Sequence, residues 1–526
     1  MGIGAENMTD EETKIVSAAS AGSGFARREL LKGLVSGVAL SQAAVAWGAN
    51  TESTFPARSE APLHYASLLD VARLIKGGDL RSTELTQLLL DRIEAVDGSL
   101  HGYVTLMADQ AMDSARFAEA EILAGRYKGP LHGVPIGIKD LCFTQGVPTM
   151  AGTKVLSDFI PEYDATVVAK LKAAGAVILG KLTLCEGAHG PYHPELEVPV
   201  NPWNARRWSG VSSSGNGVAT AAGLCFGSVG TDTGGSIRYP SAVNGCVGLK
   251  PTYGRVSRYG VFALAESMDH VGPMTRTVTD AAIMFEAMAG FDSNDPTSLA
   301  EPVPAVVTEL QRGVAGLRIG IDRDYSTNDV EPEVVLAVGE VISELKRQGA
   351  EIVDVKMPDV SNVGQLWLDI EAVEAVIANA ATFPSRADEY GPGFRQVLEN
   401  GRQTSGVTYA RAWQLRAEFT TRLHRMLAKV DCMVCPTMAG PASLKLSDPY
   451  VVETDAVWES LVPNDVFCAP FNFGRVPTLS VPCGFSKDGM PLSVQFVGSR
   501  LSEAVICRVG YAYEQANVWH SKHPNL

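Results

Sequence analysis

Apolar side chains recur with helical spacing in several segments that follow residue 60. Leucines and isoleucines keep this spacing from Ser67 to about Ala95, and apolar residues keep it again from about Ala108 to Ala124. The segment Asp164–Gly175 adds an acidic residue suited to a helix N-terminus and a glycine that would end the helix. All three segments are therefore predicted to be helices.

Short apolar runs between these segments predict strands. Ala176–Leu179 and Leu224–Val229 are two such runs. Leu317–Ile321 and Glu351–Val355 are two more, and they flank a predicted helix at about Glu333–Arg347. Strands that alternate with helices in this way predict an α/β fold, in which helices cover both faces of a sheet.

Two segments depart from this alternation. Residues from about 360 to 428 have a mainly helical pattern, so we expect them to form a cover over the sheet. Ser293–Gly316 contains three prolines and is the best candidate for an internal hinge or a surface excursion.

The first fifty residues have the order of regions that marks an export signal. Arg27-Arg28 precedes an uncharged apolar run from Gly33 to Ala46, and small residues follow that run. The arginine pair resembles the twin-arginine export signal of bacteria, although Ala26 and Leu30 replace the residues usual beside it. An uncleaved N-terminal anchor is the alternative, but the run is shorter than the ~20 residues of a spanning helix. We expect residues 1–49 to direct export to the periplasm and residues 60–526 to form the folded domain.

Composition narrows the partners of the protein. The net charge is −15 and the isoelectric point is about 5.2, so a nucleic-acid partner gains no electrostatic support. Cys432 and Cys435 have the spacing of a redox motif or half a zinc site, but no second pair completes it. Because they lie in the apolar run Val430–Pro436, we expect a buried strand there, with neither a metal site nor a cofactor.

Candidate chemistry is concentrated in two glycine- and serine-rich stretches. Ser212-Ser213-Ser214-Gly215 is followed by Gly230–Arg238, in which a Gly-Gly pair precedes Ser236. Bare glycine backbone beside a hydroxyl suits acyl transfer, because its N–H groups can receive the developing oxyanion. No histidine lies near Ser236 in sequence, and neither stretch fits the Gly-x-Ser-x-Gly elbow. Lys139, at the end of the apolar run Gly133–Ile138, is a candidate base, since burial lowers the pKa of a lysine.

These stretches together resemble the amidase signature family, whose members hydrolyse amides with a Ser–Ser–Lys triad. The resemblance covers roughly residues 65–520 and is most specific between Asn201 and Ser257. It continues in Asp269–Pro273, Pro470-Phe-Asn472 and Tyr513–Ala516. It implies the family's fold, a large twisted mixed sheet flanked on both faces by helices.

The resemblance assigns a role to each matching position. Ser236 matches the nucleophile, Lys139 the base, and Ser212 the serine that bridges them, typically after a cis peptide bond. The backbone N–H groups of the oxyanion hole match Thr233, Gly234, Gly235 and Ser236. Supporting positions match Ser213, Asp232 and Arg238, although Arg238 is equally well explained as a structural ion-pair partner of Asp232. Ser214 stands where the family usually has glycine, and its extra hydroxymethyl could crowd the loop or alter the proton relay.

The substrate is less well determined by the sequence. Met150, Glu186, His189 and His193 are candidates to line the substrate channel, against an ordinary loop role for the histidines. Tryptophans at 203, 208, 367, 413 and 458 weakly indicate an aryl or other apolar acyl group. We therefore expect a stand-alone amidase that acts on a small-molecule amide, without stable membrane insertion, and a homodimer is left open.

Three alternatives accompany this expectation. One is a carbamate or peptide C-terminal amide hydrolase of the same family. The second is a glutamine-dependent amidotransferase A subunit, because Gly254–Gly260 is very like that branch. The tRNA and the protein partners of that subunit are cytoplasmic, so the export signal argues against this alternative. The third is a non-catalytic relative, which would predict loss of Lys139, Ser212 or Ser236, and none of them is lost.

Overall fold

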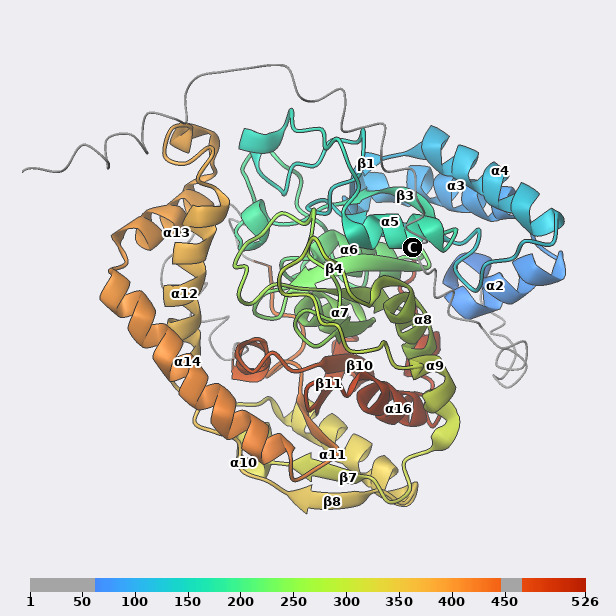
Figure 1. The fold of residues 1–526 in the computed structure, drawn as a ribbon. Coiled ribbons are helices and arrows are strands. Elements are labelled where there is room, and N and C mark those ends of the chain that lie inside the picture. The colour runs from blue at the N-terminus through green and yellow to red at the C-terminus, as the bar shows by residue number, and fades with distance from the viewer. Residues whose placement is uncertain (1–61, 446–465) are drawn as a thin grey trace, which may run out of the picture. The chain divides into compact units, whose positions relative to one another are not determined.

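The structure is a computed structural model that describes residues 62–445 and 466–526. Its strands are β1 Tyr103–Leu106, β2 Pro135–Lys139, β3 Val177–Leu182, β4 Gly227–Asp232, β5 Val247–Lys250, β6 His270–Thr275, β7 Arg318–Ile321, β8 Glu351–Asp354, β9 Cys432–Pro436, β10 Thr478–Phe485 and β11 Pro491–Gly498. Within the described residues they form one eleven-stranded sheet in the order β1-β3-β2-β4-β6-β5-β10-β11-β9-β7-β8 (Figure 1).

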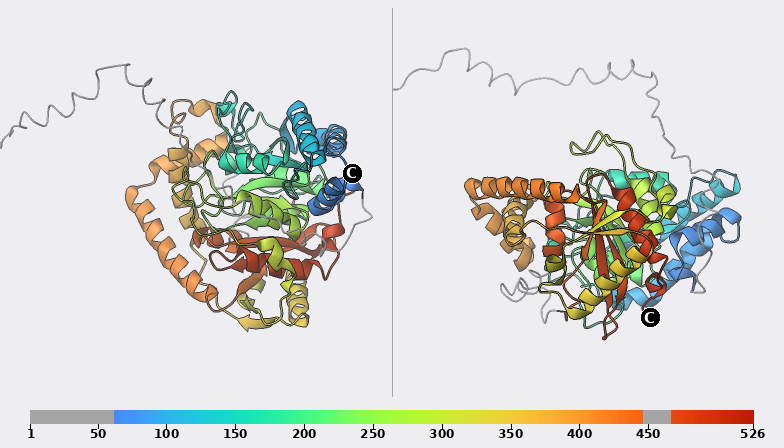
Figure 2. Two further views of the ribbon diagram at one scale, coloured as in Figure 1. Left: turned by 45° about the vertical axis from the view of Figure 1, so that its right-hand side comes forward. Right: turned by 90° about the horizontal axis from the view of Figure 1, so that it is seen from below.

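The α-helices lie on both faces of this sheet (Figure 2). They are α2 Leu68–Gly77, α3 Ser82–Leu100, α4 Ala108–Leu123, α5 Thr166–Ala173, α6 Ser214–Ala221, α7 Arg238–Asn244, α8 Val278–Met288, α9 Val306–Glu309, α10 Arg323–Thr327, α11 Pro332–Arg347, α12 Val363–Ala378, α13 Pro392–Gln403, α14 Gly406–Leu427 and α16 Glu503–Glu514. The predicted α/β class with a large mixed sheet is therefore confirmed.

Parallel and antiparallel pairs alternate in blocks across the sheet. Strand β2 pairs in parallel with both β3 and β4, while β4 pairs antiparallel with β6. The ladder from β6 through β5, β10 and β11 to β9 is antiparallel, and β7 then pairs in parallel with β9 and β8. Because β2 and β4 run the same way, their carboxyl ends meet at one edge of the sheet, which is where ligands bind in open α/β sheets.

Three local predictions differ from the structure. The helical pattern from Ser67 onwards is two helices, because Gly78 adopts a left-handed φ of 80° and ends α2. The N-cap of α5 is Ala165 rather than Asp164, whose carboxylate instead binds Gln145 and Lys172. Strand β4 lies three residues later than the apolar run predicts, because its small polar residues are fully buried between β2 and β6.

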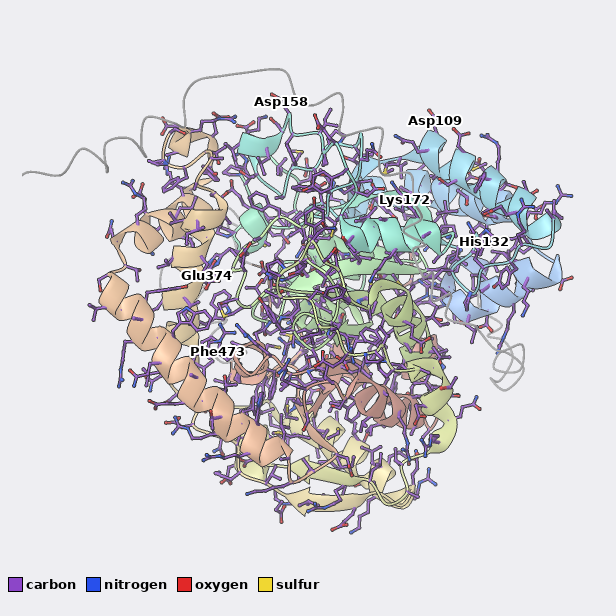
Figure 3. All side chains as sticks on the ribbon, viewed as in Figure 1. Asp109, His132, Asp158, Lys172, Glu374 and Phe473 are labelled. Atoms are coloured by element: carbon purple, nitrogen blue, oxygen red, sulfur yellow. The ribbon has the colours of Figure 1, made fainter. Side chains whose placement is uncertain are left out.

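Helices α12–α14 form a cover that packs against the sheet through its own apolar cluster. Phe419, Leu423 and Phe473 belong to this cluster, which reaches residues of β9 and β11. On α12, the Glu374 carboxylate accepts hydrogen bonds from the Ser267 N–H at 2.9 Å and the Tyr409 hydroxyl at 3.1 Å. Figure 3 labels Glu374 and Phe473 in this region. The cover is thus attached to the sheet by apolar contacts and to the loop before β6 by a hydrogen bond.

Some expectations fall outside these residues. The export signal and the boundary near residue 49 lie outside the described residues and stay predictions, and so does a role for Trp458. None of the described helices is long and apolar enough to cross a lipid bilayer. All nine cysteines are buried and none of them forms a disulfide, and Cys432 and Cys435 lie in the buried strand β9, as their apolar surroundings predict.

Candidate active site

Lys139 is the last residue of β2 and lies at the sheet edge where β2 and β4 end. Ile138 is level with Val229 of β4, so Lys139 projects beside the polar end of that strand. Its ammonium donates hydrogen bonds to the Ser212 hydroxyl and to the Thr231 hydroxyl, both at 2.8 Å. The structure therefore brings together two residues that are 73 positions apart in the sequence.

The environment of Lys139 increases the fraction of its side chain that is a neutral amine. Its side chain is fully buried, and this burial lowers the pKa of Lys139 from 10.5 to about 8. Burial disfavours the charged form because the interior solvates an ammonium ion poorly, and no carboxylate pairs directly with Lys139 among the described residues. A lysine with such a pKa can accept a proton near neutral pH.

Ser212 and Ser236 lie on adjoining loops. The peptide bond between Val211 and Ser212 is cis, as the family resemblance implies. The N–H of Ser213 donates to the carbonyl of Ser236 at 3.2 Å, which ties the two loops together. The Ser236 hydroxyl has no hydrogen bond to Ser212 or to another described residue, and Ser236 retains 9% exposure. The link from Ser212 to Ser236 is therefore open in this structure, while the link from Lys139 to Ser212 is formed.

A buried ion pair holds the loop that carries Ser236. Arg238 binds the Asp232 carboxylate with two nitrogens at 2.9 Å, and both side chains are fully buried. Asn472 adds a hydrogen bond to each of the Asp232 carboxylate and carbonyl, at 2.9 and 3.0 Å. Burial alone would raise the pKa of Asp232, but the Arg238 guanidinium holds it well below its usual range. Asp232 is therefore a fixed anion around which the loop folds.

The N–H groups of this loop differ in what they bind. The Gly235 N–H donates to the Asp232 carboxylate at 2.8 Å, so it is used inside the loop rather than directed at a substrate. No acceptor within the described residues binds the N–H groups of Thr233, Gly234 or Ser236. Gly235 has a φ of 143°, and a Cβ there would lie 2.2 Å from the Tyr239 ring, so only glycine fits. Three of the four predicted oxyanion donors thus have no protein acceptor, whereas the fourth, the Gly235 N–H, is bound to Asp232.

The two remaining serines of the run support the site. The Ser213 hydroxyl donates to the Thr231 carbonyl at 3.1 Å and accepts from the Thr231 N–H at 3.3 Å. Ser214 begins α6, and its hydroxyl accepts a hydrogen bond from Tyr192 at 2.7 Å. The hydroxymethyl at Ser214 is therefore accommodated by a buried partner that the sequence did not indicate.

The four candidate channel residues have different surroundings. His189 binds the Glu371 carboxylate of α12 at 3.0 Å and stacks on Trp367 of the same helix, with ring centroids 5.9 Å apart. Glu186 accepts the Gly391 N–H at the start of α13, and burial raises the pKa of Glu186 to about 7. His193 accepts the Glu195 N–H within its own loop, and the Met150 N–H donates to Asp140. His189 and Glu186 thus connect the site to the cover, and His193 does so too through a hydrogen bond with the Glu389 backbone, whereas Met150 contacts Asp140.

Sequence reasoning missed several contributors to the site. Thr231 lies in the stretch Gly230–Arg238 and Asn472 in Pro470-Phe-Asn472, so both lie in motifs that resemble the family. The motifs did not indicate which groups these two side chains bind. Trp367 donates its indole N–H to the Thr233 carbonyl at 3.0 Å, across 134 residues of sequence. Trp203 instead donates to the Asn244 carbonyl and packs on Phe485. Within the described residues no group of histidine, cysteine and carboxylate side chains could hold a metal ion.

Comparison with known proteins agrees with this geometry. The family model described as Amidase matches residues 84–507. The chain is 44% identical to "Putative amidase AmiD" of Mycobacterium tuberculosis (strain H37Rv) over 90% of this chain and 99% of that protein. It is 37% identical to the A subunit of glutamyl-tRNA(Gln) amidotransferase from Chloroflexus aggregans, over 88% of this chain and 99% of that protein.

Solved structures give the same result. The native peptide amidase of Stenotrophomonas maltophilia is similar with a TM-score of 0.75 and 30% identity, over 86% of this chain and 96% of that one. The fold, the family model and the relatives coincide across the segment that carries Lys139, Ser212 and Ser236. The chain therefore belongs to the amidase signature family and is a hydrolase that acts on amide C–N bonds.

Proposed function

We propose that this protein is a stand-alone amidase that hydrolyses an aryl or small apolar carboxamide through an acyl-enzyme on Ser236. The observation that carries the proposal is the buried Lys139 amine, 2.8 Å from the Ser212 hydroxyl and at the base of the Gly-Gly-Ser loop. This arrangement supplies a base, a relay and a nucleophile without histidine.

The proposed reaction begins with proton transfer. Neutral Lys139 takes the proton of Ser212, which takes that of Ser236, while the Ser236 oxygen forms a bond to the amide carbon. The carbonyl oxygen becomes an oxyanion and accepts hydrogen bonds from the loop N–H groups. The C–N bond then breaks as the proton returns through Ser212 to the leaving nitrogen. Water attacks the acyl-enzyme next, which releases the carboxylic acid and restores Ser236.

The preference for an aryl or small apolar group is supported by a cavity beside the loop. Its volume is about 260 Å³, and Thr231 and Thr233 of the loop form part of its wall. Aromatic side chains line it as well, and so do charged ones, whereas Ser236 does not; these are Phe143, Tyr259, Phe262, Arg258, Asp269 and Asp295. A cavity of about 150 Å³ is enough to hold benzene, so this one has room for a substituted aromatic ring.

Hydrolysis of a peptide C-terminal amide is a second candidate. It is favoured by the similarity to the peptide amidase at 30% identity over most of both chains. The amidotransferase role is the less favoured alternative, because we also propose that residues 1–49 export the protein to the periplasm. Arg27-Arg28 and the apolar run that follows motivate that proposal.

A hydrolysis screen with matched variants tests these proposals. Mature enzyme is assayed with anilides, small aliphatic amides, carbamates and peptide amides, and with glutamine. We expect the anilides to be the fastest substrates and Ser236→Ala to abolish their hydrolysis without changing the thermal midpoint. Ser241→Ala is the control, since Ser241 is a buried serine of α7 whose hydroxyl has no partner among the described residues. Turnover that survives Ser236→Ala would remove the acyl-enzyme, and a clear preference for peptide amides or glutamine would replace the aryl proposal.

A further inference from the structure

The cover helix α12 reaches directly into the loop that precedes Ser236. Two of its residues, Trp367 and Glu371, are four positions apart and therefore lie on one face of the helix. Trp367 donates to the Thr233 carbonyl at 3.0 Å, and Glu371 binds His189 at 3.0 Å. His189 in turn stacks on the Trp367 ring with an interplanar angle of 19°. The face of the indole is thus packed against His189, while its N–H contacts the loop.

The contact fixes the orientation of one particular peptide group. The carbonyl of Thr233 and the N–H of Gly234 belong to the same planar unit, and in a trans peptide they point in opposite directions. An indole N–H that holds the carbonyl on the α12 side therefore directs the Gly234 N–H away from α12. The Thr233 side chain is fixed as well, because its hydroxyl donates to the buried Asp269 carboxylate at 2.6 Å.

The indole also packs against the Gly234 backbone. A Cβ at Gly234 would lie 3.0 Å from the Trp367 ring, which is closer than side chains normally approach. Glycine at this position therefore permits the close approach that lets the indole N–H reach the neighbouring carbonyl. The next peptide is fixed differently, since the Gly235 N–H donates to Asp232. The peptide that carries the Gly234 N–H is therefore bound by Trp367 of the cover. The next peptide is bound by Asp232, the last residue of β4.

We propose that Trp367 is a positioning residue that aims the Gly234 N–H at the oxyanion formed on the substrate. The cover helix α12 then contributes to catalysis through its contact with the loop. This inference rests on the proposed acyl-enzyme mechanism, because it needs an oxyanion beside Ser236.

The test replaces the indole N–H while retaining an aromatic ring. Trp367→Phe removes the donor, and Trp413→Phe is the matched control, because Trp413 lies on α14 and packs on Arg416 and Tyr409 instead. We expect Trp367→Phe to lower kcat on an anilide about tenfold while KM changes by less than about twofold. A trifluoromethyl ketone, which forms a tetrahedral adduct with a serine, should bind about tenfold more weakly. Affinity for the carboxylate product should stay the same.

Gly234→Ala gives an independent measurement if Trp367→Phe does not fold. Its methyl group would push the indole away from the loop and weaken the hydrogen bond to the Thr233 carbonyl. We therefore expect kcat to fall while KM is unchanged. Where both variants fold, the losses in the double variant should be less than additive, because both act on one peptide. Unchanged kcat and inhibitor affinity in Trp367→Phe, a loss confined to KM, or additive losses would each overturn the inference. Turnover by Ser236→Ala would instead overturn the mechanism beneath it, so the two failures are distinguishable.

Discussion

The pH dependence of hydrolysis tests the buried lysine most directly. Burial lowers the pKa of Lys139 from 10.5 to about 8, and only the neutral amine can accept the proton of Ser212. At pH 7 a pKa of about 8 leaves about a tenth of Lys139 neutral, whereas the ordinary value leaves about 0.03%. Burial therefore increases the neutral fraction of Lys139 about 300-fold at that pH.

The direction of the pH dependence is set by the protonation state of Lys139 that accepts the proton. Because neutral Lys139 is the proposed base, kcat/KM should rise with pH through a midpoint near 8 and reach a plateau above it. Initial rates on an anilide between pH 6 and 10, at substrate concentrations well below KM, measure this profile for the free enzyme. Lys139→Ala should leave no comparable rise.

A second variant moves the midpoint in a stated direction. The Thr231 hydroxyl accepts a hydrogen bond from Lys139 at 2.8 Å, and such a bond stabilises the ammonium more than the amine. Thr231→Val should therefore lower the midpoint by about one pH unit. Thr220→Val is the control, because Thr220 is buried on α6 and its hydroxyl contacts Ser228 and Cys225 instead. A wild-type profile that is flat between pH 7 and 9, or a midpoint that rises in Thr231→Val, would refute the reasoning.

Two further predictions concern stability and location. Arg238→Met leaves the buried Asp232 carboxylate unpaired, so the free energy of unfolding measured with urea should fall by about 3–5 kcal/mol. Arg347→Met, which breaks an exposed pair on α11, should change it by less than about 1 kcal/mol, and equal losses would contradict the role of burial. Replacing Arg27 and Arg28 by lysine should keep the protein in the cytoplasm, as judged by cell fractionation. Unchanged periplasmic yield would contradict a twin-arginine route.

The positions of Lys139 and Ser236 in the fold were predictable because both residues lie in local patterns. Lys139 follows an apolar run that becomes β2, and Ser236 follows the glycines of its own loop, so strand and turn chemistry located both. The same reasoning misplaced β4, because Gly227–Asp232 is polar in sequence and fully buried in the sheet. An apolar pattern identifies a buried strand only where the adjacent strands and helices leave room for large side chains.

Contacts across the fold could not be predicted from local patterns. Nothing near Thr233 indicates that its carbonyl meets Trp367, and nothing near Asp232 indicates that Asn472 binds it 240 residues later. Even the oxyanion glycines needed the structure, since Gly235 turns its N–H inward to Asp232. The sequence determines which groups are available, whereas the packing of distant elements determines which of them point at a substrate.

The place where the cover joins the sheet has a consequence for how such enzymes can change. Helices α12–α14 connect β8 to β9, and both of those strands pair with β7, so the connection leaves and returns within two strand spacings. A segment with neighbouring ends can be replaced by one of different length at small entropic cost. Natural exchange or engineering could therefore fit a new cover between the same two strands, β8 and β9. Under the positioning role proposed for Trp367, a replacement cover would have to reproduce the indole contact to Thr233 to keep the rate of hydrolysis.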